Sequence, residues 1–239
     1  MSRLRHLGLA AALAGALACG CTATPLPEPP AETLNIDRIH APEYSPATTI
    51  IEIVGDPGAG PPGHTLRVTN LDNDNPPVDV VIAGDGSFAV SLSGDLVDEL
   101  RFQTRSGRDR AQPIDMIWGS RTVMPAARIE CVQPEPLQQQ DFELVTVGGS
   151  AASRTIVVRN DCPDSVEVTA AGLRSVDSAF ALGNPEILLP LSIDPAAEAT
   201  WTIDFAPAEM GDAEEIFFLQ LSTGGEQERY PITLYGDGE

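Results

Sequence analysis

The stretch "TWTIDF" (Thr200–Phe205) decides how this chain folds. Its Trp, Ile and Phe occupy every second position, and the residues between them are Thr, Thr and Asp. Successive side chains of a β-strand point to opposite faces, so this alternation predicts a strand with one buried face and one solvated face. We therefore expect Trp201, Ile203 and Phe205 to lie in the core of a sheet.

Similar segments recur upstream of this strand. The segments "TLRV" (65–68) and "SFAVSL" (87–92) alternate in the same way, and β-rich runs return at intervals of roughly ten residues. The pair Asp85-Gly86 between two such runs is a strong hairpin signal. The chain holds 21 Gly and 21 Pro and shows no convincing amphipathic helix. Together these features predict an all-β fold with many turns.

The first β-rich block resembles bacterial immunoglobulin-like modules. The similarity is carried by "VGDPGAGPPGHTLRVTN" (54–70), "GDGSFAVSL" (84–92) and "LRFQTRSGRDRAQP" (100–113), and it covers most of residues 48–118. This resemblance implies a β-sandwich domain, which we place at residues 48–124.

The second block is similar to the ASH or HYDIN-like immunoglobulin-like domains, which are relatives of the major sperm protein fold. The matching text is "VTVGGSAASRTIVVRNDC" (145–162), "LPLSIDPAAEATWTIDFAPAEMGDAEEIFFLQLST" (189–223) and "YPITLYGDG" (230–238), within residues 136–238. The resemblance implies a scaffolding or interaction domain, which we place at residues 125–239. The fold class we predict is all-β, with two tandem immunoglobulin-like β-sandwich domains.

The N-terminus has the features of an export signal. A short basic start, "MSRLRH", precedes an apolar run of 12 residues (7–18), which is shorter than the roughly 20 residues that span a bilayer. The segment "ALAC" (16–19) resembles a bacterial lipobox, whose cysteine receives a diacylglyceryl group before the signal is cleaved. We predict a lipoprotein signal peptide at residues 1–18 and a lipid on Cys19. A lipid on Cys21, or an ordinary signal peptide with two incidental thiols, is the alternative.

A Pro-rich tether is expected directly after the lipid. Within the predicted tether (residues 19–47), "TPLPEPPAE" (24–32) holds four prolines in nine residues, which favours an extended, semi-rigid spacer. Neither Gly20 nor Thr22 is the aspartate that resembles an inner-membrane retention signal in some bacteria. We therefore expect attachment to the outer membrane of the cell envelope through the N-terminal lipid.

Export also bears on the two remaining cysteines. Thiols that mature in an oxidising compartment tend to form disulfides, so Cys131 and Cys162 are expected to pair. Two buried free thiols are the alternative.

The charge of the chain is strongly negative. It carries 35 acidic residues against 14 basic ones and a formal net charge of −21, which becomes −23 without residues 1–18. Such a charge opposes nucleic acids and anionic membrane surfaces as partners. The acids are concentrated in residues 125–239, where 20 stand against 5 arginines. The cluster of Arg101, Arg105, Arg108 and Arg110 is interpreted as a solvated hairpin or as the complement of this acidic block across a domain interface. A basic patch for an anionic partner is the alternative.

Catalytic machinery is not visible in the sequence. Of three histidines, His6 leaves with the signal, while His40 and His64 have no nucleophile beside them, and no G-x-S-x-G occurs. The pair Glu214-Glu215 is read as a solvated strand edge or turn. We expect no enzyme activity and no cofactor.

One loop is a weak calcium candidate. In "NLDNDNPPVD" (70–79), the residues Asp72, Asp74, Asn75 and Asp79 supply oxygen ligands of the kind that calcium prefers. The loop lies between two predicted strands of one sheet, so a polar hairpin turn is the preferred interpretation and no metal site is predicted.

The function we expect is a non-catalytic, envelope-anchored lipoprotein that acts as a protein-interaction or structural module. An exposed sheet edge that accepts a partner strand is the expected contact surface. The alternatives are a calcium-dependent adhesin, or a sugar- or small-molecule-binding lipoprotein that uses Trp118 or the tyrosines.

Overall fold

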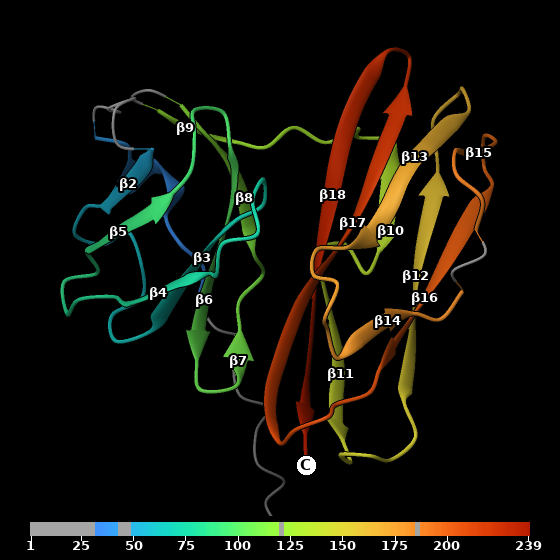
Figure 1. The fold of residues 1–239 in the computed structure, drawn as a ribbon. Helices are drawn as coiled ribbons and strands as arrows, with labels where there is room; N and C mark the ends of the chain where they lie inside the picture. The colour runs from blue at the N-terminus through green and yellow to red at the C-terminus, as the bar shows by residue number, and fades with distance from the viewer. Residues whose placement is uncertain (1–31, 43–48, 120–121, 185–186) are drawn as a thin grey trace, which may run out of the picture.

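The computed structural model describes residues 32–42, 49–119, 122–184 and 187–239, which form two β-sandwiches (Figure 1). Within these ranges the only helical element is the short 3₁₀ turn η1 (Ile36–Arg38). The predicted all-β fold of β-sandwich domains is confirmed.

The first sandwich packs a small sheet against a larger one. The small sheet has the order β1-β2-β5 and consists of β1 (Ile39–His40), β2 (Ile50–Gly55) and β5 (Phe88–Ser93). The larger sheet has the order β4-β3-β6-β8-β9, and β7 pairs with β6. Its strands are β3 (Thr65–Asn70), β4 (Val78–Val81), β6 (Glu99–Ser106), β7 (Asp109–Arg110), β8 (Ile114–Trp118) and β9 (Val123–Pro125).

The turn at Asp85-Gly86 forms but does not make the predicted hairpin. Gly86 has φ +84°, and a Cβ there would lie 2.8 Å from backbone atoms of Gly58 and Gly60, so only glycine fits. The strands that flank this turn, β4 and β5, are not hydrogen-bonded to each other and belong to different sheets. The turn therefore carries the chain from one sheet of the sandwich to the other.

Part of the predicted tether belongs to the first sandwich. Leu34, Ile39 and Ala41 are buried in its core, and β1 pairs with β2 in an antiparallel register. The described end of the predicted 19–47 tether is therefore part of the folded domain, because its apolar side chains pack into the core of the first sandwich. The proline-rich segment itself lies outside the described residues.

The second sandwich packs a four-stranded sheet against a five-stranded one. The first sheet has the order β10-β12-β16-β14: β10 (Val132–Glu135), β12 (Ala152–Asn160), β14 (Phe180–Leu182) and β16 (Glu198–Phe205). The second has the order β11-β18-β17-β13-β15: β11 (Gln139–Val145), β13 (Val166–Leu173), β15 (Leu191–Ile193), β17 (Gly211–Thr223) and β18 (Glu226–Gly238). Among the strand pairs of the described residues, β11 and β18 alone pair in parallel.

The alternation in "TWTIDF" is confirmed in β16. Trp201, Ile203 and Phe205 are buried in the core of the second sandwich, where the Phe205 ring stacks on Phe180 with a centroid distance of 4.6 Å. Gly224 and Gly225, both with positive φ, turn the chain between the two 13-residue strands β17 and β18.

The predicted disulfide is present. Cys131 and Cys162 are bonded, with an S–S distance of 2.01 Å, and they join the residue before β10 to the turn after β12. The bond therefore ties the beginning of the second sandwich to its own sheet.

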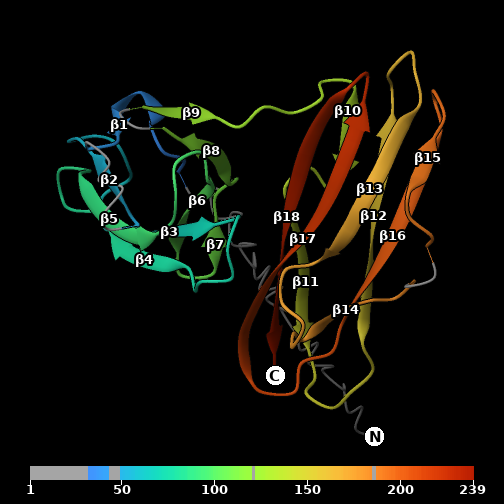
Figure 2. The same cartoon turned by 45° about the horizontal axis from the view of Figure 1, so that its top comes forward.

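The two sandwiches lie side by side and share an interface (Figure 2). The larger sheet of the first sandwich faces the β11-β18-β17 side of the second, and the chain crosses between them after β9. None of the described segments forms a helix long and apolar enough to cross a membrane.

Candidate functional site: a buried ionic interface between the sandwiches

Strand β6 is buried on both of its faces. Its Leu100 and Phe102 point into the core of the first sandwich and are fully buried. The alternate positions Glu99, Arg101 and Gln103 are only 3 to 5% exposed although they are polar. These polar side chains are covered by the second sandwich.

Strand β18 presents the matching face of the second sandwich. Tyr230, Ile232 and Leu234 belong to the core of that sandwich. The alternate residues Pro231 and Thr233 face β6 and accept hydrogen bonds from it. Two sheets thus meet face to face, with polar groups between them.

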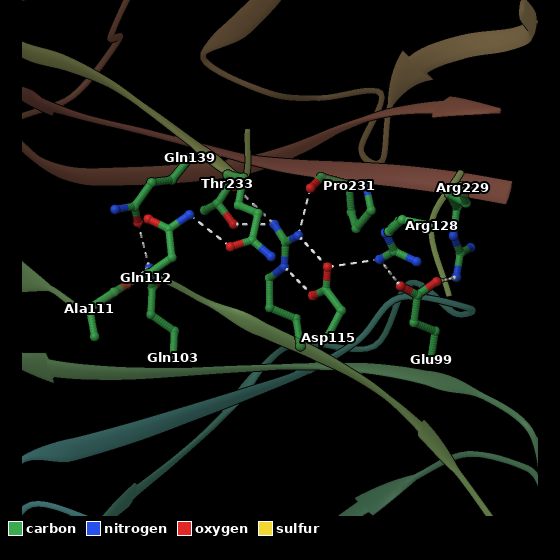
Figure 3. Close-up of polar contacts among 12 residues, drawn as sticks. Glu99, Gln103, Ala111, Gln112, Asp115, Arg128, Gln139, Arg229, Pro231 and Thr233 are labelled. Atoms are coloured by element: carbon green, nitrogen blue, oxygen red, sulfur yellow. Dashed lines mark hydrogen bonds and ion pairs between the residues drawn. The ribbon is translucent and has the colours of Figure 1, made fainter. Parts of the chain in front are cut away.

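Arg101 is the centre of this interface, and its partners Asp115, Pro231 and Thr233 are labelled in Figure 3. Its guanidinium group donates two hydrogen bonds to Asp115 of β8, from Nε to Oδ1 at 2.7 Å and from Nη2 to Oδ2 at 2.8 Å. It also donates from Nη1 to the Thr233 hydroxyl at 2.8 Å and from Nη2 to the Pro231 carbonyl at 2.5 Å. One side chain therefore joins its own sheet to β18 of the other sandwich.

Two further arginines extend the network along the interface. Arg128, from the segment between the sandwiches, donates to Asp115 Oδ2 at 2.9 Å and to the Glu99 carboxylate. Arg229 of β18 donates to the other Glu99 oxygen at 3.1 Å. The carboxylates of the first sandwich are thus shared among arginines of β6, the connecting segment and the second sandwich (Figure 3).

A second ionic cluster lies at the other end of the contact. Glu214 of β17 accepts hydrogen bonds from Arg67, at 3.1 Å, and from Arg105. Nearby, the guanidinium of Arg110 lies 4.2 Å from the ring centroid of Tyr235. The arginine cluster of the first block therefore complements the second block across the interface, as one of its interpretations predicted.

The interpretation of Glu214-Glu215 as a solvated edge or turn is wrong. Both residues lie inside β17, Glu215 is buried, and Glu214 is held by the two arginines. The first sandwich covers the face that carries Glu214, which the sequence of the second block alone does not reveal. Glu215 instead accepts the backbone N–H groups of Ser175 and Ile216 within its own sandwich.

The Asp115 carboxylate of the interface stays charged in the fold. Burial raises the pKa of Asp115, but the guanidinium groups of Arg101 and Arg128 outweigh that effect and hold it below the ordinary value. Burial likewise raises the pKa of Tyr230 to about 12, and its hydroxyl donates to the Ile129 carbonyl at 2.9 Å. At neutral pH Asp115 is therefore charged and paired with arginines, while Tyr230 is neutral.

The calcium candidates do not meet around a common point. Asp72 accepts the Glu99 backbone N–H at 2.6 Å and pairs with Arg229 at 2.9 Å, while Asp79 forms a two-bond pair with Arg67. Residues 71–77 link the paired strands β3 and β4, as the hairpin interpretation expected. Across the described ranges no group of three His, Cys, Asp or Glu side chains is arranged to hold a metal ion.

The remaining candidates lie apart from one another. His40 pairs with the Asp56 carboxylate at 3.7 Å, whereas the described histidines make no side-chain hydrogen bond to a serine or cysteine. Trp118, the candidate for binding a sugar or small molecule, is buried at 1% exposure, and Trp201 is buried at 2%. Neither tryptophan offers an exposed platform for a sugar. The lipidation candidates Cys19 and Cys21 lie outside the described residues.

Comparison with known proteins gives remote structural likenesses only. Neither a protein-family model nor a curated protein sequence matches the chain. The VesB protease of Vibrio cholerae is 11% identical with a TM-score of 0.41, over 73% of this chain and 62% of that protein. A protein of unknown function from Porphyromonas gingivalis is 12% identical with a TM-score of 0.36, over 86% of this chain and 98% of that one.

An ASH/PapD-like domain of human CEP192 is 14% identical with a TM-score of 0.35, over 48% of this chain and 91% of that domain. The match to VesB covers 62% of that protein, which is less than two thirds of its length. Identities this low, with TM-scores below 0.5, carry no information on function.

Proposed function

We propose that this protein is a non-catalytic lipoprotein of the bacterial cell envelope, anchored in the outer membrane through Cys19, whose joined sandwiches act as a protein-interaction or structural module. The observation that carries the proposal is the buried ionic interface around Arg101. It supports a module in which two sandwiches are held in one orientation and move together as a single body.

The chemistry of the interface favours this role. Hydrogen bonds between guanidinium and carboxylate groups are strong and directional, so they select one relative placement of two sheets. A body of fixed shape behind a lipid and a proline-rich spacer suits contact with neighbouring proteins at a set distance from the bilayer. Nucleic acid is not a proposed partner, because the net charge is −21.

The absence of an enzymatic role is also part of the proposal. The buried carboxylates of the interface, Glu99 and Asp115, form ion pairs with arginines. Their arrangement supports a structural use of charge.

Lipidation can be tested in cells that are grown with an alkyne-labelled palmitate. We expect label on the wild-type protein and on Cys21→Ser, partition of both into the detergent phase, and recovery with the outer membrane. Cys19→Ser should lose the label and the partition. Label that follows Cys21 instead would move the anchor to that residue. An unlabelled wild-type protein that begins at Met1 in the cytosol would overturn the proposal.

A further inference from the structure

Strand β5 has a free edge. It is the last strand of its sheet, and it pairs with β2 along one side only. The Gly94 N–H donates to the Thr49 carbonyl at 3.0 Å, which marks this pair as a hydrogen-bonded pair of the antiparallel ladder. Hydrogen-bonded and non-hydrogen-bonded pairs alternate along such a ladder, so the N–H and C=O groups of Ala89 and Ser91 point away from β2. In the described part of the chain no strand is hydrogen-bonded along that side of β5. The Asn70 and Asn73 side chains donate to the Ser93 carbonyl at 3.2 Å, so the open part of the edge is Ala89 and Ser91.

Among the described residues the other sheet edges are protected, whereas Ala89 and Ser91 of β5 are not. Edges of natural sheets are blunted by short length, charge, proline or a bulge, because a bare edge recruits further strands. Among the described edge strands, β1, β9, β14 and β15 have two or three residues, and β4 carries Asp79. β10 carries Pro134 and Glu135, and β11 carries two acids and a register shift. The six residues "FAVSLS" of β5 include no charge, proline or bulge.

An apolar groove opens beside this edge. It has a volume of about 410 Å³ and lies between the end of β5 and the segment that enters β4, with Ile50, Pro76, Pro77, Val78 and Leu92 among its lining residues. The turn at residues 83–87 joins β4 to β5 at the end of these two strands that lies away from the groove. Ile50 is 42% exposed there. The groove can therefore receive an apolar side chain from a strand that lies along β5.

Acidic residues surround the edge. Residues 71–99 contain seven acids and no basic residue. Three of these acids, Asp72, Asp79 and Glu99, pair with arginines, and Arg174 donates to the carbonyls of residues 73 and 75. Asp74, Asp85 and Asp95 are exposed, and Glu52, which is opposite Ser91 in the register, is exposed on β2. An added strand thus meets an uncharged backbone edge within a negative rim. Charge complementarity favours a partner with basic residues beside the pairing segment.

We propose that the free edge of β5 accepts an extended segment of a partner protein as an added antiparallel or parallel strand, with an apolar side chain in the groove and lysine or arginine residues toward the rim. This proposal rests on the proposed function as an interaction module, and it names the surface and the kind of partner. A second copy of the chain is not the proposed occupant, since the same acidic rim would face itself.

The test uses the protein purified from cells in detergent and a displayed library of nine-residue segments as the probe. We expect the selected segments to combine alternating β-branched or aromatic residues with basic ends. A synthetic peptide of such a sequence should slow amide exchange at Ala89 and Ser91. Its binding should weaken about tenfold or more in Ser91→Pro, which removes an outward N–H, and stay unchanged in Ser91→Thr.

A second variant leaves the backbone intact. Glu52→Lys reverses the charge of the rim opposite Ser91, so it should weaken the basic peptide several-fold at low salt and less at high salt. The proposal is overturned if no segment is enriched, if Ser91→Pro binds the peptide as well as Ser91→Thr, or if the two amides are protected by self-association instead. Palmitate labelling of Cys19 does not depend on β5, so this inference and the proposed function can fail separately.

Discussion

The core of the second sandwich and the interface between the two sandwiches are both buried, but they are built from opposite residue types. The core consists of side chains such as Ile203, Phe205 and Phe217, which are fully buried. The interface contains Glu99 and Arg101, which are 5 and 3% exposed. Apolar burial is not directional, whereas paired guanidinium and carboxylate groups accept few geometries. The core therefore supplies stability to each sandwich, and the interface sets how one sandwich lies on the other.

This difference predicts different responses to substitution. A core cavity remains in the folded state because the surrounding sheet relaxes only partly. An interface can separate and let water reach its charges. Truncation in the core should therefore lower the stability of one sandwich, while a change in the interface should uncouple two sandwiches that stay folded.

The largest effect is expected from Phe205→Ala. The ring contacts Phe180 and Phe142, with centroid distances of 4.6 and 5.8 Å, and it is fully buried. We expect the free energy of unfolding of the second sandwich to fall by about 4 kcal/mol, as measured by denaturant titration. Val176→Ala, at a position that is 98% exposed, is the matched control and should change it by less than about 0.5 kcal/mol. Equal effects of the two variants would contradict the assignment of this core.

The next effect is expected from Arg101→Met. This change leaves Asp115 buried without its two-bond partner, and loss of one member of a buried pair costs about 3 kcal/mol or more. We place it at about 3 kcal/mol because opening of the interface lets the carboxylate hydrate. Calorimetry should show one transition for the wild type and two for Arg101→Met, since each sandwich keeps its own hydrophobic core.

The double variant Arg101→Met with Asp115→Leu sharpens this comparison. It removes both charges, and Arg128 keeps its pairing with Glu99. We expect it to recover most of the lost stability, because a well-packed apolar pair often replaces a buried ion pair without loss. A double variant as unstable as Arg101→Met alone would mean that contacts of Arg101 to Pro231 and Thr233, and not its charge, hold the interface.

Sequence patterns predicted the cores well. The two-residue period placed Trp201, Ile203 and Phe205 correctly, and compartment reasoning placed the Cys131–Cys162 disulfide. The first inference depends on a local property of one strand, and the second depends on the compartment in which the whole chain matures. A period of two is a property of a single strand, and an oxidising compartment acts on every exported thiol.

The interface was predictable only in outline. In β6, polar residues alternate with apolar ones, and this is also the pattern of a strand with a solvated face. The sequence does not show that β18 covers that face, because the partner strand lies more than a hundred residues away. For the same reason Arg128 and Arg229 could not be singled out. The charge imbalance between the two blocks was the one available signal, and it indicated contact without naming the pairs.

The smallest effect is expected from lowering the pH, which should weaken the interface and leave the core intact. The pKa of Asp115 is held below its ordinary value of 3.8 in the fold, so its charged form stabilises the folded state above that pH. This contribution is lost as pH falls from about 4 through the lowered pKa. Asp79, whose hydrogen bond from Arg67 lowers its pKa, has the same sign. Small-angle scattering should show the sandwiches separating below about pH 4, while the near-ultraviolet signal of the buried Trp201 persists. In the double variant that lacks Arg101 and Asp115, the acid response should be weaker. An acid response of equal size in that variant would place the titrating groups elsewhere in the molecule.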